Sequence, residues 1–276
     1  MAHQNYKPPS KLSRHRLAIQ AGFAVLWMIP LRMFNVCSPV FHCYACPLAA
    51  FACPVGVLAQ FSALHAFPFI ALGTLGLTGA LFGGFVCGWA CPFGLLQDLA
   101  AKVPTPKFEL PAWAGSFRYV VLAGLVVAVP WFFGETHPLF FCRVCPAGAL
   151  EVAVPAAVQA QLAGQAIIWP NALKLGVTLA VVAAMFFIRR PWCGALCPLG
   201  AIFGLFSRIS MFSVRFYPGR CSECGLCDKT CAYGVDSAVR ADDPRCIRCL
   251  ECARCKACEV VPAWKPVLPA DPPKTA

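Results

Sequence analysis

Charged residues are scarce in this chain, and their scarcity excludes an ordinary soluble protein. Asp, Glu, Lys and Arg make up 13% of the 276 residues, whereas hydrophobic residues make up 59% and the mean hydropathy is +0.67. A soluble globular domain carries roughly 25% charged residues. The composition therefore predicts a membrane protein with a small polar appendix.

The sequence also lacks the motifs that serve nucleotide or hydrolytic chemistry. It contains no glycine-rich phosphate loop, no dinucleotide fingerprint and no Ser, His and Asp set. Its formal net charge of +11 does not indicate nucleic acid, because no basic stripe with interleaved aromatic residues is present. Most Lys and Arg flank apolar runs, where they orient a membrane protein and contact anionic lipid. We expect membrane lipid, and no nucleic acid, as a partner.

Four apolar runs predict membrane-spanning helices, each of which takes about 20 residues. Lys and Arg gather before the first run, between the second and third, and after the fourth, which places both termini in the cytoplasm. Arg118 is expected to extend to the membrane interface, and the stretch 149–168 to form a helix at or dipping into the membrane. The predicted spans of this multi-pass protein of the bacterial cytoplasmic (inner) membrane are 17–36, 64–86, 113–133 and 172–188.

The densest group of the 19 cysteines lies near the C-terminus. Cys221 opens a C-x2-C-x2-C-x3-C run that ends at Cys231, and a second run begins at Cys246. This spacing is typical of bacterial two-cluster ferredoxins, in which three thiolates of one run and the last thiolate of the other bind each 4Fe-4S cluster. One predicted cluster takes Cys221, Cys224 and Cys227 with either Cys255 or Cys258; the other takes Cys246, Cys249 and Cys252 with Cys231.

Structural zinc is the competing interpretation of these runs, since C-x2-C pairs also suit zinc. Zinc sites usually separate their two pairs by a dozen or more residues, and neither run does so. Two features depart from the ferredoxin pattern. Cys231 is followed by Ala232 instead of proline, and Lys256 stands where the x3 spacing would place the last cysteine, which leaves Cys255 and Cys258 as alternatives.

A C-P-x-G unit occurs four times, and its spacing indicates an internal repeat. The units begin at Cys53, Cys91, Cys145 and Cys197, two in each half of the membrane region. Parallel repeats are related by an axis along the membrane normal, so matching units of the two halves should meet. We expect an all-α membrane region of two parallel pseudo-repeats, 1–108 and 109–210, followed by a ferredoxin-like cytoplasmic domain, 211–276.

The repeat predicts two further cysteine sets, one near each face of the membrane and each shared between the halves. Four thiolates are the ligand set of one cubic cluster, so the chain would hold four 4Fe-4S clusters in all. The glycine of each unit would let the backbone approach the cluster, and the proline would begin the next helix. Thiol–disulfide switches, copper sites, docking elements and buried cysteines without a role are the competing interpretations. The cytoplasmic set is Cys87, Cys91, Cys193 and Cys197; the outer set is Cys142 and Cys145 with two of Cys43, Cys46 and Cys53.

Together these features resemble a known family. The four spans, the C-x3-C-P motifs that begin at Cys87 and Cys193, and the C-terminal two-cluster module are similar to the membrane-bound polyferredoxins of the NapH, NosR, MauN and CcoG type. The resemblance implies electron transfer between the quinone pool, or a membrane-associated redox partner, and another redox protein. The additional cysteines resemble a branch of iron–sulfur binding membrane proteins; these are Cys43, Cys46, Cys53, Cys142 and Cys145.

The sequence thus predicts an electron-transfer subunit of a larger respiratory complex. Its partners would be a c-type cytochrome, a ferredoxin or a quinone-linked subunit, and a quinone is a candidate cofactor. One alternative is a quinol dehydrogenase subunit in which only the ferredoxin clusters form. The other is an assembly or regulatory factor for a copper or multihaem respiratory enzyme. Gln97 and Asp98 would either contact a quinone or cap the cytoplasmic end of their helix.

Overall fold

The fold is known from a computed structural model that describes residues 15–29, 31–166, 169–217, 221, 227, 230–231, 233–235, 243–254 and 257–262. Two of the predicted ligands, Cys224 and Cys255, lie outside the described residues. The described part is mostly helical, as predicted. Its helices are Arg16–Trp27 (α2), Pro54–Ala63 (α3), Phe69–Phe82 (α4), Phe85–Trp89 (α5), Pro92–Ala100 (α6), Phe117–Val120 (α7), Val129–Phe133 (α8), Phe141–Val144 (α9), Pro146–Gly148 (α10), Val154–Leu162 (α11), Ala172–Phe187 (α12) and Pro198–Leu205 (α13).

Tighter or wider helical turns connect several of these helices, and four strands complete the described fold. The 3-10 segments are Ala112–Ser116 (η1), Phe206–Arg208 (η5) and Cys252–Arg254 (η7). The π-helical segments are Val121–Ala128 (η2), Ala149–Ala153 (η3) and Trp192–Leu196 (η4). The strands are Met33–Cys37 (β1), Phe51–Ala52 (β2), Phe212–Phe216 (β3) and Cys258–Pro262 (β4).

The first two predicted spans are wrong in their extent. Helix α2 ends at Trp27 because the sequence has proline at position 30, which lacks the N–H that a continuing helix needs. Helix α4 begins only at Phe69, after a turn that contains the exposed His65. It ends at Phe82, where Gly83 takes a φ of +52° that breaks the helix.

The third and fourth predicted spans are confirmed as helices. The stretch Ala112–Phe133 is continuously helical, and in the described part of the chain it alone is long and apolar enough to cross a membrane by length and composition. Helix α12 begins at Ala172 as expected and has 16 residues. The helix predicted over 149–168 is confirmed as far as Leu162.

The prediction of an all-α membrane region is wrong at one small sheet. Strand β1 pairs in parallel with β2, inside the region expected to be helical. In the C-terminal module β3 pairs with β4 in antiparallel register, from Phe212 opposite Pro262 to Phe216 opposite Cys258. Aromatic and β-branched residues make up half of this second pair and favour extended backbone.

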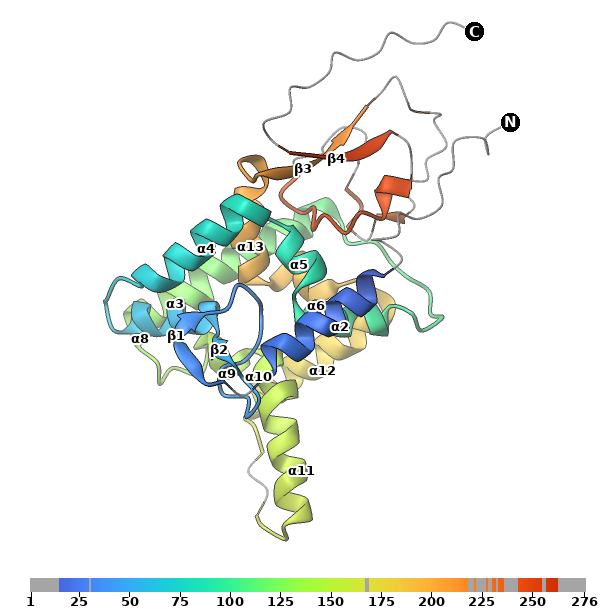
Figure 1. Ribbon diagram of the computed structural model, residues 1–276. Helices are drawn as coiled ribbons and strands as arrows, with labels where there is room; N and C mark the ends of the chain where they lie inside the picture. The colour runs from blue at the N-terminus through green and yellow to red at the C-terminus, as the bar shows by residue number, and fades with distance from the viewer. Residues whose placement is uncertain are drawn as a thin grey trace, which may run out of the picture.

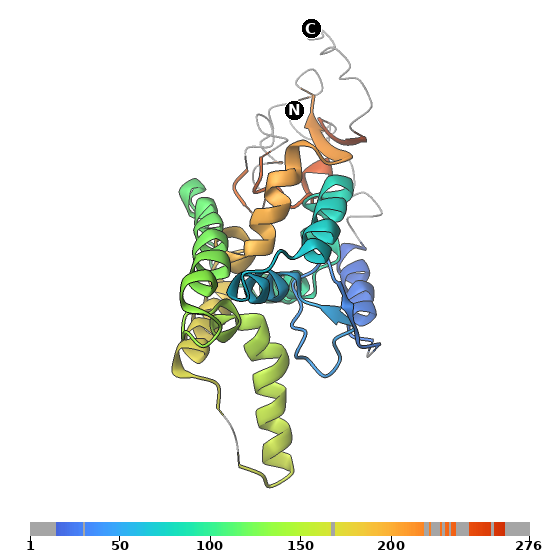
Figure 2. The same cartoon turned by 90° about the vertical axis from the view of Figure 1, so that its left-hand side faces the viewer.

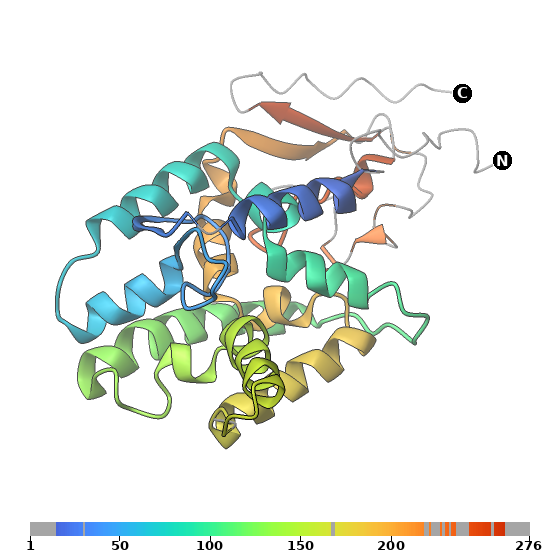
Figure 3. The ribbon, with the colours of Figure 1, turned by 60° about the horizontal axis from the view of Figure 1, so that its bottom comes forward.

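The helices pack into one body with the strand pair β3–β4 at one end and α11 projecting from the other (Figure 1). Helix α2 lies along α6, the helix that begins at the second C-P-x-G unit (Figure 3). Helix α13 contacts α7 and η2 in the second half. None of the residues of α11 is buried, and Figure 2 shows this helix extending away from the bundle.

Candidate functional site

Each C-P-x-G unit begins a helix in the same way. Its cysteine is the N-cap residue in extended conformation and its proline is the first helical residue, which confirms the role predicted for the proline. Cys197 Sγ accepts a hydrogen bond from the Gly200 N–H at 3.4 Å. In the other three units the glycine N–H faces the sulfur and favours the thiolate. The repeat therefore places four sulfurs at helix N-termini, where a thiolate is stabilised.

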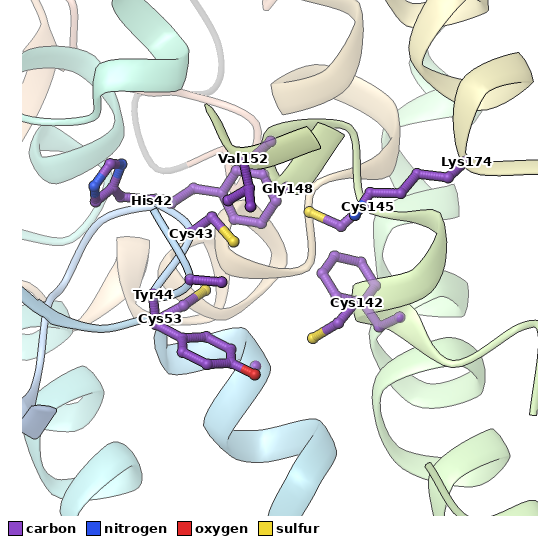
Figure 4. Close-up of a pocket in the computed structure, with 14 residues that line it drawn as sticks. His42, Cys43, Tyr44, Cys53, Cys142, Cys145, Gly148, Val152 and Lys174 are labelled. Carbon is purple, nitrogen blue, oxygen red and sulfur yellow. The ribbon is translucent and has the colours of Figure 1, made fainter. Parts of the chain in front are cut away.

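Four thiols surround a cavity of about 210 Å³ on the side of the bundle that carries α11 (Figure 4). Two of them come from the first half of the chain and two from the second, and their sulfurs point toward the common space. Lys174 and Tyr44 also line it. We call the four thiols the outer set: Cys43, Cys53, Cys142 and Cys145.

The glycines of two units make room for the thiol of the opposite half. A Cβ atom added to Gly56 would lie 3.6 Å from Cys142 Sγ. A Cβ atom added to Gly148 would lie 3.5 Å from Cys43 Sγ. Each half thus leaves space beside a sulfur that the other half supplies, as expected of a site shared through a pseudo-twofold axis.

Cys46 is the predicted outer candidate that the cavity leaves out. It is half-buried, its backbone N–H donates to the Cys43 carbonyl, and it does not line the cavity. Of the three candidates that the sequence leaves open, Cys43 and Cys53 line the cavity and Cys46 does not. That Cys43 and Cys53 are the ligands stays a prediction. Cys37 lies in a separate small apolar cluster.

A second set of four thiols lies in the main buried core. Burial, and then the charges of the other three thiols, raise the pKa of Cys197, so the four are close neighbours. Burial also raises the pKa of Cys193 to about 12. Thiols this deep stay protonated unless positive charge accompanies them, and the irons of a cluster supply such charge. We call them the inner set: Cys87, Cys91, Cys193 and Cys197.

Gln97 supports the inner set directly. Its Nε2 donates to Cys193 Sγ at 2.9 Å, and its Oε1 accepts from the Trp192 N–H at 3.2 Å. The side chain is fully buried. Gln97 therefore contacts a predicted cluster ligand.

Asp98 belongs to a buried ion network beneath the same set. Arg190 donates to it through Nε at 2.7 Å, and Arg16 also pairs with it. Although burial opposes ionisation, these two guanidinium groups lower the pKa of Asp98. Arg190 also donates to the Cys87 carbonyl at 3.1 Å and is 1% exposed. The network thus joins α2 and α6 to the segment before Cys193.

Arg118 is buried, which corrects the expectation that it extends to the membrane interface. It is 2% exposed, and no carboxylate of the described residues pairs with it. Its Nε has no hydrogen-bond partner among those residues. Its charge acts on Cys87. A buried cation is costly without a counter-charge, and a thiolate-ligated cluster is a net anion, so Arg118 fits such a group at the inner set.

Phe41 connects the outer and inner sets. Its ring lines the outer cavity and packs 5.5 Å from Phe93 and 5.9 Å from Trp192, centroid to centroid. Its backbone N–H donates to the Cys91 sulfur. The two sets are therefore neighbours in one core, whereas a bilayer core is about 30 Å thick. The expectation of one site near each membrane face is corrected to two adjacent sites.

The ferredoxin-like module brings together one predicted set. A small cavity of about 40 Å³ is lined by Cys231 together with the thiols of the second run, which are Cys246, Cys249 and Cys252. Cys258 lies beside Cys252, where a hydrogen bond between the two raises the pKa of Cys252. Of the other predicted set, Cys227 packs in an apolar cluster with Cys258, and Cys221 is half-buried.

The Cys246–Cys252 loop lies directly against α5, the helix that carries Cys87. A Cβ atom on Gly88 would lie 2.4 Å from the Ile247 carbonyl oxygen, and one on Gly84 2.5 Å from that of Cys246. Ile247 belongs to the same core as the inner set. Only glycine allows this approach of the two backbones.

Arg248 anchors this loop and was not predicted from the sequence. Its Nη2 donates to the Ser207 carbonyl at 2.6 Å and its Nη1 to the Phe82 carbonyl at 3.3 Å. It is 1% exposed with a φ of +52°. The available signal was a single arginine between two ligand cysteines, which the motif treats as a free position.

Within the described residues, no three His, Cys, Asp or Glu side chains meet at the spacing of a single-ion site. The thiols of the outer set stand apart around their cavity. Their donor chemistry, the helix N-termini behind them and the glycine cradles fit a 4Fe-4S cluster, which separates its four thiolates by the width of the cube.

Two segments of the chain, 64–111 and 173–216, match the family described as the 4Fe-4S binding domain. One lies in each half, and each contains one C-x3-C-P motif of the inner set. These segments occupy the membrane region predicted from the sequence, not the C-terminal module alone.

The chain is also a distant relative of the MauN and NosR proteins, which confirms the resemblance drawn from the motifs. It is 28% identical over 178 residues to the uncharacterized protein MJ0750 of Methanocaldococcus jannaschii, covering 61% of this chain and 66% of that protein. It is 27% identical to the putative electron transport protein YccM of Escherichia coli, over 69% of this chain and 53% of that protein. It is 27% identical to the methylamine utilization ferredoxin-type protein MauN of Methylorubrum extorquens, over 59% of each.

The matches thus span about half to two thirds of the length of these relatives. No solved structure matches the chain at a significant level.

Proposed function

We propose that the protein is a membrane-integral electron-transfer subunit that relays electrons through four 4Fe-4S clusters. The relay would connect a quinol pool or an extracytoplasmic redox partner with a partner on the cytoplasmic side. The names of two relatives, a putative electron transport protein and a ferredoxin-type protein, support electron transfer. The observation that carries the proposal is that thiols from both halves meet twice, at the outer and the inner set.

The four sites would form a line. Phe41 joins the outer set to the inner set. Arg190 acts on Cys193 of the inner set and on Cys249 of the ferredoxin-like module, so those two sets are close. Cys252 then contacts Cys258, which is one of the two candidates for the last ligand of the remaining set. Electron transfer needs only such closely spaced cofactors, whose potentials the surrounding charges and hydrogen bonds adjust.

The proposal includes a four-span topology with both termini in the cytoplasm. The helix Ala112–Phe133 and the apolar helices α4 and α12 support it, as does the distribution of Lys and Arg. Reporter fusions after residue 103 and after residue 136 provide the test. A cytoplasmic reporter should be active at the first position and an extracytoplasmic one at the second. The opposite pattern would contradict the topology.

Iron and acid-labile sulfide analysis of the anaerobically purified protein tests the cluster number. Four clusters give about sixteen irons per chain, and the ferredoxin pair alone gives about eight. Cys53→Ser should lower the count by about four. The matched control is Cys46→Ser, which removes a cysteine of the same loop that does not face the cavity and should leave the count unchanged. A wild-type count near eight would contradict the proposal.

A quinol as the electron donor is favoured by one specific observation. An open groove of about 480 Å³ borders Cys142 and Lys174, and an apolar groove of about 300 Å³ runs along α11. The two grooves share Ala153, Trp169 and Pro170. A polar head beside the outer set and an apolar tail along α11 would suit them. Val158→Trp should narrow the apolar groove and slow reduction of the clusters by quinol, without changing their reduction by dithionite.

A further inference from the structure

The sixth residue after the cysteine of a C-P-x-G unit has a special place in this fold. In the second unit it is Gln97 and in the third it is Glu151, whereas Ala59 and Phe203 occupy the other two. Both polar residues reach across to the opposite half of the chain. Gln97 contacts Cys193 and Trp192, and Glu151 contacts the Cys43 backbone.

Glu151 and Gln97 accept similar backbone hydrogen bonds but differ in charge. Glu151 Oε2 accepts the Cys43 N–H at 2.7 Å and lies 2.9 Å from His42 Nδ1. Gln97 Oε1 accepts the Trp192 N–H at 3.2 Å, while its Nε2 donates to Cys193 Sγ. We call these two contacts between the halves the clasps. The Glu151 clasp places a carboxylate beside the outer set, and the Gln97 clasp places an N–H donor on a sulfur of the inner set.

Beyond these clasps, the surroundings of the two sets also differ in charge, because the inner set has more buried positive charge around it. Arg118 and Arg190 are both buried against the inner set, and only Arg190 is balanced by Asp98 among the described residues. At the outer cavity, the charges of Lys174 and Glu151 act on Cys43 in opposite senses. Positive charge and N–H donation to sulfur stabilise the reduced, more negative state of a cluster. Negative charge destabilises that state.

Resting on the proposed function, we propose that this clasp position sets the order of the two potentials: Gln97 raises the potential of the inner site and Glu151 lowers that of the outer site. One electron would then pass from a reduced 4Fe-4S cluster held by the outer set to an oxidised one held by the inner set. No other reactant takes part in this step. The direction is inward, toward the ferredoxin-like module.

Near-isosteric exchanges test the inference. EPR-monitored redox titrations would follow each cluster, with signals assigned by their loss in Cys142→Ser and Cys91→Ser. The wild type should show the outer potential below the inner. Gln97→Glu should lower only the inner potential and Glu151→Gln should raise only the outer, each by about a tenfold change in the reduction equilibrium, or about 59 mV for one electron. Gln97→Leu, which removes the donor without adding charge, should lower the inner potential less.

The matched control is Gln159→Glu, the same chemical change on the exposed face of α11, which should move neither potential. Opposite shifts from the two exchanges would support the inference, since a merely structural role would not move the potentials in opposite senses. About sixteen irons with unmoved potentials, or an inner potential below the outer, would overturn it while leaving the four-cluster function intact. About eight irons would overturn both.

Discussion

The outer and inner sets share one plan but differ in their surroundings. Each takes two thiols from each half, and each includes two N-cap cysteines followed by proline. The outer set lines a cavity next to an open groove, with Tyr44 and Lys174 at its margin. The inner set lies in the core among Arg118, Arg190 and Gln97. A duplicated scaffold can therefore place two similar thiol sets in different surroundings, one beside an open groove and one in the buried core.

The largest expected difference between the sets is in stability. Cys91→Ser should remove about four irons and lower the thermal midpoint by about 10 °C, corresponding to about 4 kcal/mol. The reason is that losing the anionic cluster leaves the buried cations of the core without a counter-charge. Cys142→Ser should also remove about four irons. It should lower the midpoint much less, since Cys142 is only half-buried and borders an open groove. Thermal unfolding in detergent with parallel iron analysis measures both. Equal destabilisation would remove the contrast.

Arg118 tests the comparison further. Replacing its charge should stabilise the cluster-free protein but weaken the binding of the inner cluster. In the cluster-free protein Arg118→Leu should raise the free energy of unfolding by about 3 kcal/mol, since it removes an uncompensated buried charge. In the loaded protein the same change should weaken retention of the inner cluster against a chelator. Arg118→Lys, which keeps the charge, is the control. Destabilisation of both forms by Arg118→Leu would show that its counter-charge is not the cluster.

The contact between α5 and the ferredoxin-like module distinguishes the inner side further. Gly88→Ala should cost about 1–3 kcal/mol, because the new Cβ would meet the Ile247 carbonyl oxygen. It should also slow electron transfer between the inner set and the ferredoxin-like module. Gly76→Ala is the matched control, since a Cβ there meets nothing within 4 Å. Limited proteolysis of the 246–252 loop and flash-induced transfer rates provide the measurements; equal behaviour of the two variants would contradict the tight approach.

The smallest expected effect is at Tyr233, whose ring packs against Gly194 near the inner set. Its hydroxyl is buried and has no hydrogen-bond partner among the described residues. Tyr233→Phe should therefore raise the free energy of unfolding by about 1 kcal/mol or less. Tyr44→Phe at the outer margin, where the side chain is half exposed, should change it less. A clear loss of stability in Tyr233→Phe would reveal a partner for the hydroxyl.

Local features of the sequence predicted the local features of the sites. The C-P-x-G units indicated where helices begin and where backbone approaches sulfur, because these depend on neighbouring residues alone. Helix ends were less predictable where hydropathy continues through a backbone break, as at Gly83. The selection of Cys43 over Cys46, the burial of Arg118 and the bond from Gln97 to Cys193 depend on contacts between distant segments. The spacing of residues along the sequence does not indicate which distant segments contact each other.

The interlocking of the two halves has a consequence for how the protein is made. Cys43 and Cys53 leave the ribosome long before Cys142 and Cys145, and the inner thiols are divided in the same way. Neither shared set exists in a half-finished chain, so the proposed clusters would be inserted only after the second half has been synthesised and has docked. Until that moment the early thiols of both sets stay without the partners that the second half supplies.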